Sequence, residues 1–422
     1  MDKVKNKLLH KSHRVLQYIA SFLKWVFIAL VTGAIGGAVG GAFRVCVDYA
    51  TRFREGHEYL IYFLPLAGLV IIFLYKVSKL KSNADTNLVI NSVRTEDKVP
   101  LMLAPVIFLS TVITHLFGGS AGREGAALQL GGCIGEQVGD LFKLDEKDMH
   151  ICVLCGMSGL FSALFGTPLT ATIFAMEVIS VGIFYYSAFV PCIVSSIVSF
   201  SITNLMGLEP AVFKVSSISK LDMWSVIKVM IIGIGCAVVG IIFCLALRWS
   251  HKLAEKFFKN EYLRVVVGGV LVILLTFIFG TRYNGIGENV LHGAFEYGEV
   301  YWYDPMLKIL FTAITIGFGF KGGEIVPTMF IGATFGYVLG TVVGLDPAFA
   351  AAVGMVALFC AVVNCPMASL ALCVELFSGG SIVLFAVAIA ISFMLSGYYG
   401  LYHEQKIVYS KRRARFVDRN AK

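Results

Sequence analysis

The segment GGSAGREG, residues 118–125, places one glutamate, Glu124, inside a glycine-rich break between two apolar stretches. A carboxylate at membrane depth is costly in hydrocarbon, so an acid in this position marks a functional site by default. The segment KGGEIVP, residues 321–327, repeats the arrangement about two hundred residues later and carries Glu324. Two glycine-rich breaks, each holding a carboxylate and each opening an apolar helix, predict an ion pathway.

The composition indicates a polytopic membrane protein. Of the 422 residues, 57% are hydrophobic and 15% are charged, and the mean hydropathy is +0.80, whereas a soluble domain carries about 25% charged residues. Several apolar runs are long enough, or nearly so, to cross roughly 30 Å of hydrocarbon. The first run follows a basic leader and precedes many others, so we interpret it as a retained helix and not a cleaved signal peptide. Examples are residues 25–43, 59–75, 229–247 and 265–279.

Basic residues gather at both ends of the chain and supply much of its net charge of +8. Basic flanks stay on the cytoplasmic side, so we expect a multi-pass protein of the plasma membrane with both termini in the cytoplasm. Residues 1–24 are predicted to form an amphipathic surface helix. Residues 406–422 are predicted to be a basic tail, with no room for a soluble regulatory domain. Anchoring near anionic lipid explains these runs, and nucleic-acid binding is not needed.

The ten cysteines lie mostly inside apolar runs. Cys152 and Cys155 have redox-motif spacing and follow His150, but one histidine and two thiols in an apolar segment make a poor metal set. Small buried side chains explain these thiols better. We therefore expect no structural disulfide, no metal and no cofactor.

Two halves of the chain carry the same motifs in the same order. A ladder with glycine at every fourth position follows each break, and such ladders are helix-packing devices. The two ladders, 201 residues apart, are Gly131, Gly135, Gly139 and Gly332, Gly336, Gly340. A proline followed nine residues later by a glutamate recurs after 198 residues, as Pro168 with Glu177 and Pro366 with Glu375. These offsets predict an internal repeat with halves 25–213 and 214–405, and in such folds broken helices meet near the membrane midplane.

The first break has the chemistry of an anion site. Glycines let main-chain N–H groups face an ion, and a helix starting at Gly125 or Ala126 points its positive end into the break. Such a place attracts an anion and equally holds the carboxylate of Glu124. Deprotonated, Glu124 fills the anion site, and protonated, it leaves, which couples a proton to an anion. The alternative is that Arg123 and Glu124 form a helix-capping pair at the membrane surface.

The second break admits two interpretations of Glu324. Pro327 suits the first turn of a helix, so Glu324 is either an N-terminal capping carboxylate or, when protonated, a hydrogen-bond donor to a small hard anion. Glu177 and Glu375 occupy matching positions in the two halves. We interpret them as paired structural carboxylates near helix ends.

These residues resemble the CLC family of channels and transporters. Residues 122–125 followed by AALQLGG look like that family's GREGP signature, with Ala126 in place of the usual proline. Residues 323–327 resemble its GxFxP loop, and Tyr402 falls where the family has an inner-gate tyrosine. The resemblance covers about residues 25–405. It implies an all-α inverted-repeat fold, a homodimer whose subunits each hold a pathway, and an external gating role for Glu124.

The departures from the family pattern point to a narrower group. The usual serine loop is missing, and ungapped counting puts Asn83 at the serine, with Asn87 as a second candidate. Glu324 stands beside the position of the missing loop phenylalanine. Val178 replaces the inner proton-relay glutamate of many chloride/proton exchangers. These features resemble the fluoride-exporting branch, which also tends to carry a loop threonine, a role that Val326 and Thr328 leave unassigned.

We therefore expect a secondary active antiporter that exports fluoride in exchange for protons. Glu124 is its predicted gate and proton carrier, and Glu324 its predicted proton or fluoride ligand. The alternative is a chloride/proton exchanger or chloride channel. An enzyme is not expected, because no nucleophile–base pattern accompanies the histidines. The predicted anion-binding residues are Asn83, Gly122, Arg123, Gly125, Gly323, Ile325, Val326, Thr328 and Tyr402. The expected partners of the protein are fluoride or chloride, protons, the lipid bilayer and a second copy of the chain.

Overall fold

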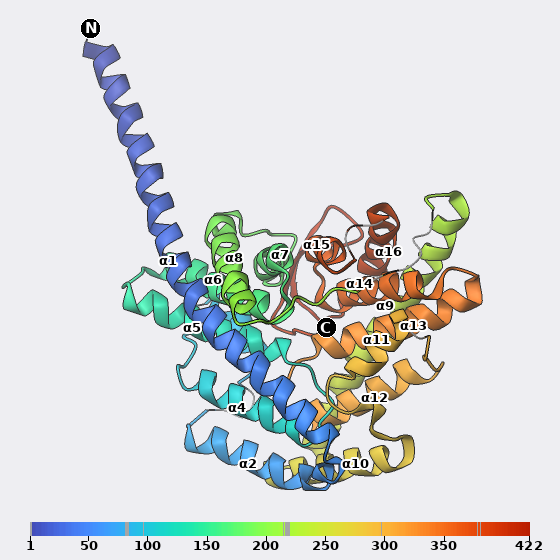
Figure 1. The fold of residues 1–422 in the computed structure, drawn as a ribbon. Coiled ribbons are helices and arrows are strands. Elements are labelled where there is room, and N and C mark those ends of the chain that lie inside the picture. The colour runs from blue at the N-terminus through green and yellow to red at the C-terminus, as the bar shows by residue number, and fades with distance from the viewer. Residues whose placement is uncertain are drawn as a thin grey trace.

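The computed structural model describes residues 2–80, 84–95, 97–213, 215, 220–296, 298–377, 379 and 381–422, with the side chains of residues 2–12 left out of the description. Sixteen α-helices make up most of this part of the chain (Figure 1). The helices of the first half are α1 (Asp2–Glu55), α2 (Leu64–Val77), α3 (Thr86–Ser92), α4 (Leu103–Leu116), α5 (Glu124–Leu141), α6 (Glu146–Phe165), α7 (Pro168–Glu177) and α8 (Phe189–Leu205).

The second half repeats this order. Its helices are α9 (Met223–Phe257), α10 (Glu261–Phe279), α11 (Glu288–Glu296), α12 (Asp304–Gly317), α13 (Ile325–Val343), α14 (Pro347–Val363), α15 (Pro366–Phe377) and α16 (Ile382–Leu395). Short 3-10 turns lie at Glu58–Phe63 (η1), Tyr186–Ala188 (η2) and Thr281–Tyr283 (η3). The starts of α4, α5 and α6 precede those of α12, α13 and α14 by 201 residues each. The predicted internal repeat is thus confirmed at the level of whole helices.

The helices are those of a membrane protein. Within the described residues, seven are long and apolar enough to cross a bilayer, and four shorter apolar helices accompany them. The helix α1 runs unbroken from residue 2 to residue 55, so no boundary separates the predicted surface helix 1–24 from the first span. No proline interrupts this stretch, and its glycines come only after residue 32. Figure 1 shows the N-terminal part of α1 projecting from the body of the fold.

The glycine ladders hold helix pairs at short distance. A Cβ on Gly131 would lie 2.4 Å from the carbonyl oxygen of Gly156 in α6, and a Cβ on Gly332 would lie 2.6 Å from that of Gly354 in α14. Neither position can accept a side chain without separating the two backbones. The two repeats therefore use the same small-residue packing, α5 on α6 and α13 on α14, and this packing fixes where each broken helix begins.

Glu177 and Glu375 tie the two repeats together. The carboxylate of Glu177 accepts the backbone N–H groups of Met367 and Ala368 at 3.2 and 2.9 Å, at the start of α15. Glu375 accepts the N–H groups of Leu169 and Thr170 at 2.9 and 2.8 Å, at the start of α7. Each acid therefore caps the helix of the opposite repeat, where free N–H groups and the helix dipole favour negative charge. This reciprocity is what a two-fold arrangement of the repeats produces.

Glu177→Gln and Glu375→Gln are expected to lower the free energy of unfolding by about 1–3 kcal/mol each, because each removes a charge-assisted cap. The thermal unfolding midpoint in detergent micelles measures this effect. Glu146→Gln, an exposed acid in the first turn of α6, is the control and should change the midpoint little. Equal midpoints for all three variants and the parent would contradict the capping role.

One small sheet is added to the predicted all-α membrane fold, which is otherwise confirmed. β1 (Ser180–Val181) pairs in parallel with β2 (Lys406–Tyr409), and β2 pairs antiparallel with β3 (Phe416–Asn420). The predicted basic tail thus folds back as a strand pair onto the segment after α7. Ile407 is fully buried in this contact, and its burial gives the tail a fixed place.

Candidate functional site

The two glycine-rich breaks are joined by hydrogen bonds. The N–H of Gly122 donates to the carbonyl oxygen of Gly323 at 2.7 Å, and the N–H of Gly323 donates to that of Gly122 at 2.7 Å. The pair is an antiparallel bridge that belongs to no strand. We call it the central bridge. The prediction that the two breaks meet is confirmed, and they meet by direct pairing of their backbones.

Glycine is required at the central bridge by its close contacts. A Cβ on Gly323 would lie 2.4 Å from the backbone nitrogen of Gly125, and a Cβ on Gly122 would lie 2.6 Å from Oε2 of Glu124. Any larger residue would therefore push apart the two breaks or displace the carboxylate. The glycines are needed for this approach of the two backbones, whereas the sequence indicated only that they let main-chain N–H groups face an ion.

Two helices begin at the central bridge. Helix α5 starts at Glu124, and α13 starts at Ile325 with Glu324 as its N-cap residue. Their first N–H groups and positive dipole ends lie beside the paired glycines, an arrangement that favours an anion. Ile325 and Val326 are buried in the first turn of α13. Their backbone N–H groups belong to the helix start that borders the site, and their side chains pack in the core.

The carboxylate of Glu124 lies among these N–H groups. It is 2% exposed. Its Oε2 accepts the backbone N–H of Arg123 at 3.0 Å, and the N–H of Val326 at the start of α13 also favours its negative charge. The side chain thus fills a place built from backbone donors of both breaks. Chemically, this place suits either a carboxylate or a small anion.

Arg123 pairs with an acid that no sequence pattern indicated. Its Nη1 pairs with Oδ1 of Asp48 in α1, and Nε of Arg44 lies 3.8 Å from the other oxygen of Asp48. Nε of Arg123 is 3.8 Å from Oε1 of Glu124. The guanidinium therefore stands between Asp48 and Glu124. No sequence signal pairs Asp48 with residue 123, because 75 positions separate them.

A large cavity reaches Glu324 and Tyr402. It has a volume of about 1010 Å³ and is lined by both residues, by Lys321 and Gly322 of the second break, and by Asn87. We call it the Tyr402 cavity. Glu124 is not among its lining residues. The two acids of the breaks therefore differ in surroundings: Glu324 borders open space, and Glu124 is enclosed.

Polar atoms without partners face this region. Oε2 of Glu324 and the hydroxyl of Tyr402 are buried and have no hydrogen-bond partner among the described residues. A Cβ placed on Gly125 would be 3.2 Å from that Glu324 oxygen, so the acid of the second break leans against the first. Thr328 donates its hydroxyl to the backbone oxygen of Glu324 at 2.8 Å, which commits that hydroxyl to the first turn of α13. Buried polar atoms are nearly always satisfied, so these two groups indicate a place for a ligand.

The chain after α16 carries Tyr402 to the cavity through backbone and amide contacts. The N–H of Leu401 donates to the carbonyl oxygen of Val362 at 2.9 Å. The amide of Gln405, which is fully buried, donates to the carbonyls of Val178 and Val363 at 2.9 and 2.8 Å. Tyr402 is thus anchored to both repeats. The tyrosine was predicted from its position after the last span, whereas no sequence pattern indicated the glutamine that holds this segment.

The two candidates for the serine-loop position have different outcomes. Asn83 lies outside the described residues. Asn87 lies in the first turn of α3 and lines the Tyr402 cavity. Its amide nitrogen donates to Asp85 at 3.1 Å, and its amide oxygen accepts the backbone N–H of Glu404 at 3.2 Å. Both ends of this amide are therefore in use.

Sequence analysis also missed two polar residues near the central bridge. The hydroxyl of Thr86 donates to the carbonyl oxygen of Gly125 at 3.1 Å and accepts from the amide nitrogen of Gln129 at 3.3 Å. Both side chains line the Tyr402 cavity. The signal for Gln129 was available, since it is a glutamine one helical turn after Gly125 in a helix buried around its start.

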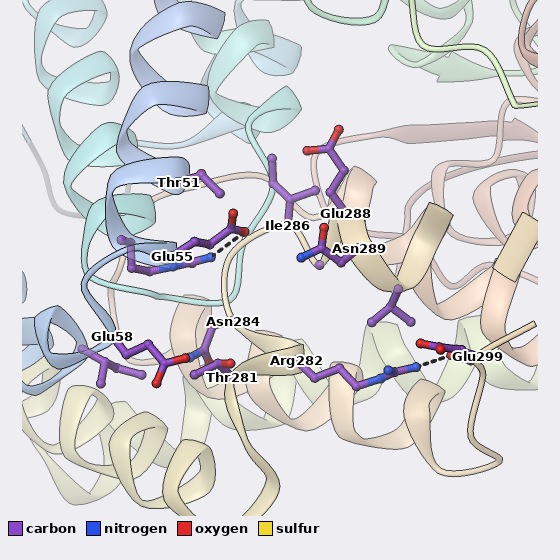
Figure 2. Close-up of a pocket in the computed structure, with 14 residues that line it drawn as sticks. Thr51, Glu55, Glu58, Thr281, Arg282, Asn284, Ile286, Glu288, Asn289 and Glu299 are labelled. Carbon is purple, nitrogen blue, oxygen red and sulfur yellow. Dashed lines mark hydrogen bonds and ion pairs between the residues drawn. The ribbon is translucent and has the colours of Figure 1, made fainter. Parts of the chain in front are cut away.

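A second cavity of about 510 Å³ lies between the end of α1 and the polar connection before α12. Figure 2 shows Thr51, Glu55 and Glu58 on one side of it, and Arg282 with Glu299 on the other. We call it the Arg282 cavity. Glu288 lies at the rim of this cavity. Its hydrogen bond with His292 is the main cause that lowers the pKa of the Glu288 carboxyl group, and the positive charges of Arg123 and Arg44 lower this pKa further. The charge of Arg123, the residue before Glu124, therefore acts on an acid that lines the Arg282 cavity.

Within the described part of the chain, no three histidine, cysteine or acidic side chains are grouped closely enough to hold a metal ion. The ten cysteines are free thiols. The polar groups around the two breaks are carboxylates, amides, hydroxyls, backbone N–H groups and the basic side chains of Arg123 and Lys321. Such groups bind anions and protons.

The fold and its paired breaks define a polytopic membrane protein built from two related repeats. The profile of the family described as "Voltage gated chloride channel" matches residues 67–397. A chloride/fluoride channel protein of Pseudomonas syringae pathovar tomato is 33% identical over 408 residues, covering 94% of this chain and 89% of that protein. The chain belongs to the CLC family of channels and transporters, and the family resemblance noted in its motifs is confirmed. It is a transport protein and not an enzyme.

Solved structures agree with this assignment. A CLC-type fluoride/proton antiporter superimposes with a TM-score of 0.88 and 32% identity, covering 91% of this chain and 98% of that one. A slow cyanobacterial Cl⁻/H⁺ antiporter gives a TM-score of 0.75 at 20% identity, covering 88% and 94% of the two chains. At this lower identity the second comparison bears on the fold alone.

Proposed function

We propose that the protein is a fluoride/proton antiporter that exports fluoride while protons flow inward. The observation that carries the proposal is the position of the Glu124 carboxylate. It accepts a backbone N–H group beside the central bridge, where helices α5 and α13 both begin. An anion arriving at this place must displace the carboxylate. The displaced acid then takes up a proton more readily, because it has lost the donors that stabilised its charge.

The Tyr402 cavity supports fluoride as the anion. Fluoride is small and strongly hydrated, so a site must replace its water with good hydrogen-bond donors. The hydroxyl of Tyr402 is a free donor at the cavity wall, and Glu324 becomes one when it is protonated. The larger and less strongly hydrated chloride gains less from such donors. Two of the relatives described above also carry fluoride in their names.

In the proposed cycle, fluoride enters from the cytoplasm through the Tyr402 cavity and meets Glu324 and Tyr402. It then replaces Glu124 among the backbone N–H groups of the central bridge. Glu124, protonated from the other side of the membrane, turns back and delivers its proton when the anion leaves. Arg123, held by Asp48, keeps positive charge beside the path on the side of the Arg282 cavity. Both termini are proposed to be cytoplasmic in a homodimer of the plasma membrane.

The experiment is a flux assay in liposomes loaded with fluoride. A fluoride-selective electrode records anion efflux, and a pH electrode records proton uptake at the same time. Fluoride efflux accompanied by proton uptake, with much slower efflux of chloride, is the expected result. Fluoride efflux without any proton movement would reject the antiport mechanism.

The alternative function is a chloride/proton exchanger or a chloride channel. The name of the Pseudomonas syringae protein, a chloride/fluoride channel protein, favours keeping it. The same assay decides between the two. Chloride moving as readily as fluoride would support this alternative, and anion flux with no proton uptake would favour a channel.

A further inference from the structure

Among the described residues, four side chains on the wall of the Tyr402 cavity have a buried polar atom without a partner. Two are Oε2 of Glu324 and the hydroxyl of Tyr402, which the proposed function already uses. A third is Nε of Arg264, whose Nη1 lies 3.4 Å from Oε1 of Glu255, and the fourth is Oε1 of Gln129 in α5. Gln129 is 3% exposed, so its amide is as deeply placed as the groups assigned to the anion.

Gln129 is adjacent to the central bridge. Its amide nitrogen donates to the hydroxyl of Thr86 at 3.3 Å, and that hydroxyl donates to the carbonyl oxygen of Gly125 at 3.1 Å. A Cβ on Gly125 would lie 3.4 Å from the Thr86 hydroxyl and 3.2 Å from Oε2 of Glu324. The backbone of Gly125 therefore lies between the Thr86 hydroxyl and the carboxyl group of Glu324. Oε1, the end of the amide without a partner, belongs to a side chain that lines the Tyr402 cavity.

We propose that Gln129 is a fluoride-binding residue of the Tyr402 cavity, with Thr86 as its positioning partner. This inference rests on the proposed function. A half-turn of the amide about its last side-chain bond exchanges oxygen and nitrogen. Oε1 then accepts the hydroxyl hydrogen of Thr86, and the NH₂ group points its donors to the place that Oε1 occupied. The hydroxyl of Thr86 can serve either orientation, because it both donates and accepts.

This arrangement suits an anion that comes and goes. With the cavity free of anion, the amide nitrogen is used by Thr86 and only an acceptor faces the cavity. When fluoride is present, the turned amide offers donors to the cavity that Tyr402 and Glu324 also line. A neutral amide supplies these donors without a fixed charge, so the anion can leave again.

A purely structural role for Gln129 predicts a different outcome. If the amide only holds Thr86 against α5, its loss lowers stability and leaves fluoride affinity unchanged. If it binds the anion, its loss weakens fluoride binding even in a protein that remains folded. Affinity and stability must therefore be measured on the same variants.

The test uses the full-length protein in detergent, with fluoride binding measured by isothermal titration calorimetry and stability by the thermal unfolding midpoint. Gln129→Leu is expected to weaken fluoride binding by about tenfold or more, the size of one hydrogen bond to a charged group. Gln137→Leu is the matched control, with the same substitution on the same helix at a half-buried position outside the cavity lining. It should leave affinity within about twofold of the parent. Gln129→Met, which is closer in shape, carries the same comparison should the leucine variant fail to fold.

Gln129→Glu adds a readout that a structural role would not produce. The carboxylate still accepts from Thr86, but it donates to fluoride only when protonated, so fluoride binding to this variant should recover as pH falls. A folded Gln129→Leu or Gln129→Met protein with the fluoride affinity of the parent would overturn the inference and leave the proposed function intact. A parent protein that binds and moves no fluoride would overturn the proposed function itself.

Discussion

Glu124→Gln is expected to end proton transport while the protein stays folded. Glutamine keeps the size of the side chain and its acceptor for the N–H of Arg123, but it cannot release a proton at neutral pH. In the liposome assay, proton uptake per fluoride released should fall by at least about tenfold, toward the leak of empty vesicles. Fluoride binding measured by calorimetry should persist, because the backbone donors of the central bridge are untouched.

Glu136→Gln is the matched control for this variant. It makes the same substitution on the same helix, at an acid that is also buried (3% exposed) but lies well away from the two breaks. It should keep the parent's ratio of protons to fluoride. If Glu124→Gln carried protons with fluoride at the parent ratio, the exchange of carboxylate and anion would be the wrong mechanism. The enclosed position of Glu124 beside the second break is the geometry that this mechanism requires.

Glu324→Ala is expected to lose much of the preference for fluoride. The buried Oε2 has no partner in the described part of the chain, so the acid can donate to a bound anion when it is protonated. Removing one donor to a charged ligand costs about 1.5–3 kcal/mol. The ratio of fluoride to chloride efflux should therefore fall by roughly tenfold or more. Glu324→Gln keeps N–H donors at the same place and should retain more of the ratio than alanine does.

Glu404→Gln controls for the loss of a carboxylate in the same cavity. Glu404 also lines the Tyr402 cavity but lies 3.6 Å from Arg94, so its charge is already paired. This variant should leave the fluoride-to-chloride ratio close to that of the parent. Glu324 occupies the N-cap position of α13 without a side-chain capping hydrogen bond, so a Glu324→Ala protein with unchanged selectivity would show that its carboxyl group does not select the anion.

The two glycine-rich breaks show how much of the structure can be predicted from local sequence patterns. Glycines around Glu124 and Glu324 are visible as interruptions in apolar runs, and a charged residue in such a run has few stable places. The two glycine ladders and the proline–glutamate pairs gave the repeat, because each is a short pattern with a fixed period. The helix starts at residues 304, 325 and 347 follow those at 103, 124 and 146 with the same offset.

Contacts between distant segments could not be obtained in this way. Glu177 and Glu375 were interpreted as structural acids near helix ends, and the structure adds that each caps the helix of the other repeat. Asp48 pairs with Arg123 only because α1 crosses beside the first break. Gln129 stands inside the AALQLGG stretch of the first motif, and its sequence position does not say which way its side chain points.

The amino-acid sequence by itself determined the membrane setting, the repeat and the two acids in glycine-rich breaks. These follow from hydropathy, spacing and the cost of burying charge, which act within a short stretch of chain. Only the tertiary structure decided that the breaks pair through Gly122 and Gly323, and that Glu324 borders a cavity while Glu124 is enclosed. Hydrogen bonding and enclosure depend on which surfaces meet in space, and no local pattern records that.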